Sequence, residues 1–76
     1  MTTEKTWDYA TLTAKAEEEI RRSLEFAGRY PGNSFEHDRY ISIACGVFWL
    51  WNSLTCGWQE QGDAARLELL ARGLAA

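Results

Sequence analysis

The side chains that could perform acid–base or nucleophilic chemistry are few in this sequence, and their spacing keeps them apart. The one histidine, His37, is followed directly by Asp38. Adjacent residues on a helix point about 100° apart, so these two cannot form the oriented base of a hydrolase triad. Cys45 lies two helical turns further on, and nothing around it indicates an activated thiolate. We therefore expect no catalytic residue and no enzyme activity, with His37 at the surface near a helix start.

Metal, cofactor and disulfide chemistry are also disfavoured. One histidine and two cysteines do not supply a closed tetrahedral site. On one helix Cys45 and Cys56 lie about 16 Å apart, whereas a disulfide needs Cα atoms within about 7 Å. Both are expected to be reduced thiols of a cytosolic protein, with an intermolecular bridge as the alternative. The sequence contains no P-loop and no G-x-G-x-x-G, so we expect no metal and no cofactor.

The charge balance disfavours nucleic acid as a direct ligand. The chain has 11 acidic and 8 basic residues, a net charge of −3, whereas nucleic-acid binders carry a basic excess. A helix-turn-helix around residues 30–34 would place a helix of Ile, Val, Phe and Trp in the major groove, where it cannot read base edges. Residues 1–6 lack the apolar core of a secretory signal, so the expected location is the cytoplasm.

The first predicted helix covers about residues 7–27 and is amphipathic. Thr6 or Asp8 can cap its start, and Gly28 with the turn at 31–33 can end it. Its opposite side carries acid-first charge pairs four residues apart. Spacing at 100° per residue predicts one core face, made of Tyr9, Leu12, Ala16, Ile20, Leu24 and Ala27.

The second predicted helix covers about residues 35–57, and no charge interrupts the 19 residues from Tyr40 to Trp58. Ser34 or Asn33 can cap it. Its length approaches that of a membrane span, but its polar residues and mid-segment tryptophans favour a buried central helix. The expected core face is Tyr40, Ile43, Ala44, Val47, Leu50, Trp51 and Leu54, with Trp58 if the helix extends so far. The reverse face is Ser42, Cys45, Trp49, Asn52, Ser53 and Cys56.

The third predicted helix covers about residues 63–75, with Asp63 as its cap. The apolar residues on one face are Leu67, Leu70, Ala71 and Leu74. The sequence therefore predicts an all-α single domain over 1–76, a compact three-helix bundle around a largely uncharged aromatic helix. A domain of this size buries only about 60% of its unfolded surface, so aromatic packing or self-association must supplement the core.

Two surfaces are candidate partner-binding sites. Trp49 and Asn52 lie on the reverse face of the second helix, where an exposed tryptophan in a neutral patch is typical of interaction hot spots. The alternative is that the third helix or the N-terminal segment covers Trp49. The acidic side of the first helix, with Glu17, Glu18 and Glu25, could meet a basic surface. Its alternative is a solvated helix face with internal ion pairs.

A short, mildly acidic, cysteine-poor helical chain without catalytic motif resembles the small anti-CRISPR proteins of phages and mobile elements. The resemblance covers the whole chain in size and character, and its nearest approach to a motif is the stretch from Phe35 to Gly46. It implies a stoichiometric inhibitor that binds a subunit of a type I CRISPR-Cas surveillance complex in the cytoplasm of a bacterial host. Interleaved arginines, at 21, 22 and 29, depart from an ideal mimic of DNA phosphates.

An interpretation of a different class remains open from the same residues. The second helix could form a homodimer or pair with a cognate subunit, as in an antitoxin or a phage assembly factor. Neither interpretation involves direct binding of nucleic acid or membrane.

Overall fold

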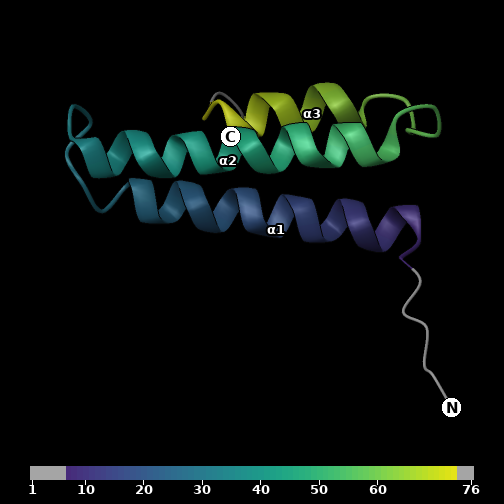
Figure 1. The fold of residues 1–76 in the computed structure, drawn as a ribbon, viewed down its shortest axis with the longest axis horizontal. Helices are drawn as coiled ribbons and strands as arrows, with labels where there is room; N and C mark the ends of the chain where they lie inside the picture. Colours follow the sequence, from purple (N-terminus) through teal and green to yellow (C-terminus); the bar gives the residue numbers. More distant parts are fainter. Residues whose placement is uncertain (1–6, 74–76) are drawn as a thin grey trace, which may run out of the picture.

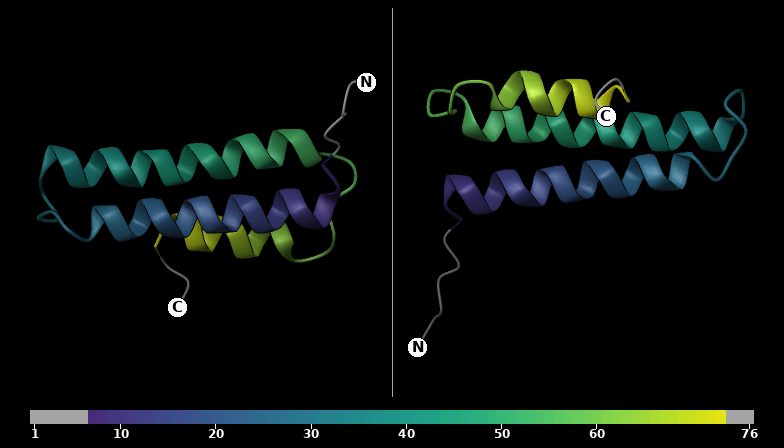
Figure 2. Two further views of the ribbon diagram at one scale, coloured as in Figure 1. Left: turned by 90° about the horizontal axis from the view of Figure 1, so that it is seen from below. Right: turned by 180° about the vertical axis from the view of Figure 1, so that it is seen from behind.

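The chain folds as an all-α three-helix bundle, as its sequence predicts. The computed structural model describes residues 7–73 and contains α1 (Tyr9–Ala27), α2 (Phe35–Thr55) and α3 (Asp63–Ala71). α1 and α2 form an antiparallel hairpin of two long helices (Figure 1). The shorter α3 runs back along the C-terminal half of α2 and also contacts α1 (Figures 1 and 2). α3 ends at Ala71 rather than near residue 75, and Leu74 of its predicted apolar face lies outside the described residues.

Two of the three predicted helix starts have the expected cap. The Asp8 carboxylate accepts a hydrogen bond from the Thr11 N–H at 2.7 Å, and the Ser34 hydroxyl accepts one from the His37 N–H at 3.1 Å. α3 differs, because its N-cap is Gly62 at φ 91° and Asp63 is its first helical residue. Glycine adopts this left-handed conformation without steric cost, and the Asp63 carboxylate instead binds the side chains of Tyr9 and Arg66.

The core lies where the three helices meet, and Trp51 is at its centre. Trp51 is 1% exposed, and its indole Nε1 donates a hydrogen bond to the Thr13 hydroxyl at 2.9 Å. The buried Thr55 hydroxyl donates to the Trp51 carbonyl at 2.7 Å. The buried polar atoms of this region are thus paired, as a low-dielectric interior requires. The apolar core residues are Ala16, Ile20, Ala44, Phe48, Trp51, Leu67, Leu70 and Ala71.

The predicted core face of α2 is wrong along one edge. Ile43, Leu50 and Leu54 are exposed, at 41%, 61% and 53%, whereas Phe48 and Thr55 are buried in their place. The reason is the position of α3, which packs on the side of α2 that holds Cys45 and Phe48. The buried stripe of α2 is therefore rotated toward α3.

The ends of the predicted apolar stripes also differ in detail. Trp58 lies beyond the end of α2 and packs edge-on against Tyr9, with ring centroids 5.5 Å apart. On α1, Leu12 and Leu24 are half-buried, while the small polar Thr13 and Ser23 are buried between helices. Small side chains at these two positions allow α1 to approach its neighbours closely.

Candidate protein-binding surface

One edge of α2 presents large apolar side chains to solvent. Ile43, Val47, Leu50 and Leu54 follow one another at intervals of four, three and four residues, which places them in one stripe along the helix. We call these four residues the seam. Val47 is half-buried and the other three are exposed. The seam lies beside α1, on the edge of α2 that α3 leaves uncovered.

A hollow of about 130 Å³ lies between the seam and α1. Its apolar lining includes Leu12 and Ala16 of α1, and Lys15 and Glu19 complete it on that side. The Lys15 ammonium lies 3.4 Å from the Glu19 carboxylate, so the charged margin is neutral. The hollow is comparable to an engineered cavity of about 150 Å³ that accepts benzene. It therefore has room for an aliphatic side chain from another molecule.

Trp49 lies about 100° around α2 from Leu50 and forms a second exposed feature. Its side chain is 61% exposed, and its ring packs edge-on against Phe48 at 5.3 Å between centroids. Neither α3 nor the described residues before α1 cover it. The structure therefore has the exposed tryptophan that the sequence left as one of two alternatives, and its role in binding remains a prediction.

Asn52, the other predicted contact on this side of α2, is half-buried and has an internal partner. Its side-chain oxygen accepts a hydrogen bond from the Gln59 amide at 2.8 Å, and the same amide donates to the Thr55 hydroxyl at 3.0 Å. These bonds fasten the turn after α2 to the helix. Asn52 can contact a partner only at its exposed margin.

The acidic residues predicted for α1 divide into two groups. Glu18 and Glu25 share a face, and each has a basic neighbour, with Lys15 at 3.7 Å and Arg29 at 3.5 Å. Glu17 points about 100° away from Glu18 and contacts α3. The three carboxylates therefore do not form one acidic surface, and partner binding by Glu18 and Glu25 remains a prediction.

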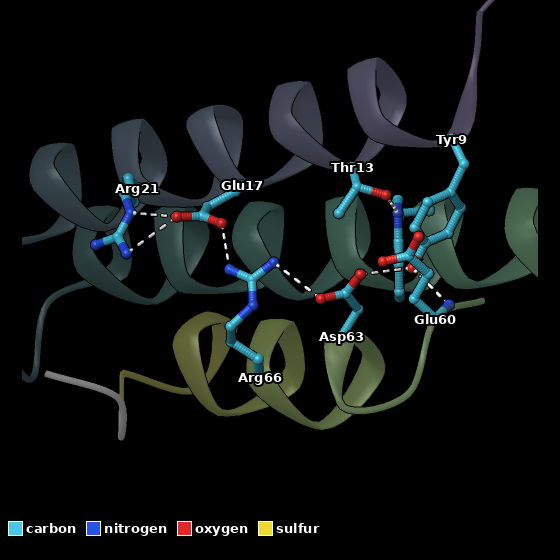
Figure 3. A network of polar contacts seen from close by, with 8 residues as sticks. Tyr9, Thr13, Glu17, Arg21, Glu60, Asp63 and Arg66 are labelled. Carbon is cyan, nitrogen blue, oxygen red and sulfur yellow. Dashed lines mark hydrogen bonds and ion pairs between the residues drawn. The ribbon is translucent and has the colours of Figure 1, made fainter.

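Glu17 belongs to a polar network that joins α1 to α3 (Figure 3). Its carboxylate accepts hydrogen bonds from Arg66 of α3 and from Arg21, the latter at 3.2 Å. Arg66 also contacts Asp63, at 3.3 Å. Hydrogen bonding from Arg66 holds the pKa of Glu17 below its ordinary value, and the same contact raises the pKa of Arg66.

Tyr9 extends this network to the start of α3. Its hydroxyl donates to the Asp63 carboxylate at 2.7 Å and accepts from the Glu60 N–H at 3.1 Å (Figure 3). Burial, followed by the hydrogen bond to Asp63, raises the pKa of Tyr9. Two of these contacts, Glu17–Arg66 and Tyr9–Asp63, join α1 to α3 and help to hold α3 in place. Sequence reasoning missed Arg66 and Tyr9 as its members, because pairs about 50 residues apart leave no local pattern.

The residues tested for chemistry lie apart in the structure. His37 Nδ1 is 3.5 Å from Asp38, and the imidazole is only partly exposed rather than fully at the surface. Cys45 and Cys56 are both free thiols. Within residues 7–73 no group of three or more His, Cys, Asp or Glu side chains is placed to hold a metal ion. None of the described helices has the length and apolar character needed to cross a membrane.

Comparison of the chain with protein-family models, curated proteins and solved structures finds no match.

Proposed function

We propose that this protein is a non-catalytic binding module whose contact surface is the uncharged, exposed side of α2 around Trp49. The observation that carries the proposal is the 61% exposure of Trp49 within a helix that has no charge from Tyr40 to Trp58. Exposed aromatic residues in neutral surroundings are costly to leave in water and are typical centres of protein interfaces.

Burial of the Trp49 side chain in an interface would contribute a sizeable part of the binding free energy. A tryptophan buries roughly 150–250 Å², so covering the exposed 61% of Trp49 removes roughly 90–150 Å² from water. At about 25 cal/mol per Å² this contributes about 2–4 kcal/mol. That is the size of a hot-spot contribution, before the entropic cost of association.

We further propose that the partner is a subunit of a type I CRISPR-Cas surveillance complex and that binding blocks its activity. The support is the resemblance of the whole chain to anti-CRISPR proteins in size and character. On this proposal Glu18 and Glu25 add an electrostatic contribution to a basic surface of the partner. Salt would weaken that contribution, because exposed charges are screened.

Capture experiments with purified surveillance subunits at graded salt test this proposal. Wild-type protein and the Trp7→Ala control should retain a subunit, and Trp49→Ala should weaken retention by roughly 30-fold or more, in line with a hot-spot truncation. Trp7 is a matched control because it is also an exposed tryptophan, 53%, and lies outside α2, just before α1.

Two outcomes decide between mechanisms. If retention falls as salt is raised and in the Glu18→Lys/Glu25→Lys variant, the acidic residues contribute to binding. If retention changes with neither, they do not contribute. Failure to capture any subunit, together with no protection of phage in a CRISPR-active host, contradicts the anti-CRISPR proposal.

A second function is favoured by a separate observation, the regular stripe of the seam. A homodimeric structural or regulatory module would use that stripe to associate.

A further inference from the structure

We infer that the seam binds a second copy of this chain, with the two α2 helices packed antiparallel about a twofold axis. The inference rests on the second function proposed above and deepens it by giving the geometry of self-association, on a different edge of α2 from Trp49. It rests on the spacing of the seam, on the distribution of charge along α2 and on the size of the uncovered face.

The spacing of the seam is the same when it is followed from either end. Ile43, Val47, Leu50 and Leu54 are separated by four, three and four residues, which is the spacing of core positions in helices packed side by side. When two such helices run antiparallel, Ile43 faces Leu54 of the second copy and Val47 faces Leu50 of the second copy. Every seam residue then meets an apolar residue, as a self-complementary interface requires.

The charges of α2 permit this pairing. No charged residue lies between Arg39 and Glu60, so self-association brings no like charges together along the seam. Parallel packing would bring Glu36 and Asp38 at the start of α2 together with the same residues of the second copy, whereas antiparallel packing keeps the two acidic pairs at opposite ends. Lys15 and Glu19 on the α1 margin already neutralise each other at 3.4 Å. Separation of the acidic helix starts and neutrality along the seam favour the antiparallel direction.

The uncovered face has the size of a specific interface. α2 has 21 residues and is about 31 Å long at about 1.5 Å per residue. The α1–α2 hairpin is about 20 Å wide, because each helix is about 10 Å across. A strip of α2 alone covers on the order of 300 Å² per copy, so α2 of the second copy must also cover the α1 side of the hollow. Pairing over the whole hairpin face then covers on the order of 600 Å² per copy, about 1,200 Å² in total, at the lower limit of stable interfaces. The hollow beside Leu50, about 130 Å³, lies where Val47 of the second copy approaches.

Trp49 stays outside this interface. The centre of the seam and Trp49 point about 130° apart around α2, so a dimer leaves two Trp49 surfaces exposed on its outer sides. The proposed partner surface and the self-association surface are therefore separable by mutation.

Mass measurement and cysteine cross-linking together test the inference. Sedimentation equilibrium of the wild-type chain under reducing conditions should give twice the chain mass of 8.7 kDa. A monomer at all concentrations up to about 1 mM, the upper end of weak association, overturns the inference. This measurement needs no partner, so it separates failure of the dimer from failure of the proposed function.

The direction of pairing is tested in a Cys45→Ser/Cys56→Ser background, which removes the native thiols. Ile43→Cys and Leu54→Cys are made in separate chains, mixed in equal amounts and oxidised. Antiparallel pairing predicts a disulfide-linked dimer in the mixture and little from either variant alone, because a disulfide requires Cα atoms within about 7 Å. Efficient cross-linking of Ile43→Cys alone indicates parallel helices, and no cross-linking in the mixture places the contact elsewhere. Either result overturns the proposed interface.

Discussion

Replacing Glu17 by glutamine should destabilise the bundle, although the sequence suggests a solvent-facing acid. Glu17 is the acceptor for Arg66 of α3 and for Arg21, and its side chain is 28% exposed. Hydrogen bonds to charged groups contribute about 1.5–3 kcal/mol. Arg66 is 46% exposed, so solvent screening reduces the contribution toward the about 1 kcal/mol of a surface pair. Glutamine retains one acceptor oxygen, and the expected loss at pH 7 is about 1 kcal/mol.

The pH dependence of this loss has a definite sign. The pKa of Glu17 is lowered in the folded state. Its stabilising contribution is therefore complete above the unfolded pKa, about 4.3, and is lost as the pH falls through the lower folded pKa. The difference in unfolding free energy between wild type and Glu17→Gln should be largest at pH 5–7, taken as roughly constant there, and should shrink as the pH is lowered below about 4.

Urea unfolding followed by far-UV circular dichroism measures this difference, at one protein concentration because association would shift the midpoint. Glu18→Gln is the matched control. The Glu18 carboxylate is 58% exposed and 3.7 Å from Lys15. Its removal should change the free energy of unfolding by less than about 0.5 kcal/mol. Equal losses in the two variants, or a Glu17 effect that persists unchanged at about pH 3, would refute the structural role of the Arg66 contact.

Three further substitutions test other parts of the fold. Thr13→Val leaves the buried Trp51 N–H without its acceptor and should cost about 1–3 kcal/mol in chemical denaturation, so an unchanged midpoint would contradict the packing of α1 on α2. Tyr9→Phe removes the 2.7 Å bond to Asp63 and should cost about 1 kcal/mol in thermal unfolding; no change would mean that this bond does not hold α3. Gly62→Ala meets no neighbouring atom, but φ is +91°, so a loss of about 1 kcal/mol is expected, and unchanged stability would contradict the left-handed turn.

The helices were predictable because their ends carry local signals. Asp8 and Ser34 each precede a helix with a side chain suited to capping, and the structure uses both. Gly62 has no side chain to signal a cap, so the sequence favours Asp63 as the cap of the third helix instead. The contact between Glu17 and Arg66 joins residues 49 positions apart. Periodicity within one helix cannot reveal such a pair.

The orientation of α2 was harder to predict for a physical reason. A helix without charge from Tyr40 to Trp58 offers little contrast between a buried and an exposed side. Aliphatic residues on the Leu50 edge were therefore assigned to the core, although Phe48 and Thr55 occupy it. The packing of α3 determines which side of α2 is buried. Ile43, Leu50 and Leu54, which lie outside the core, belong to the seam.

The central claim is that the uncovered side of α2 is a binding surface with two separable edges. Leu50 and Trp49 are sequence neighbours with the same exposed fraction, 61%, so Leu50→Glu and Trp49→Glu add the same charge at equally accessible positions. Sedimentation equilibrium of the two variants, each checked for helix content, tests the claim most directly. The expected result is a monomer for Leu50→Glu, with self-association weakened roughly 100-fold or more because each copy buries a charge opposite the apolar Val47 of the other, and a dimer for Trp49→Glu. A dimer that survives Leu50→Glu, or that is lost in Trp49→Glu, would contradict it.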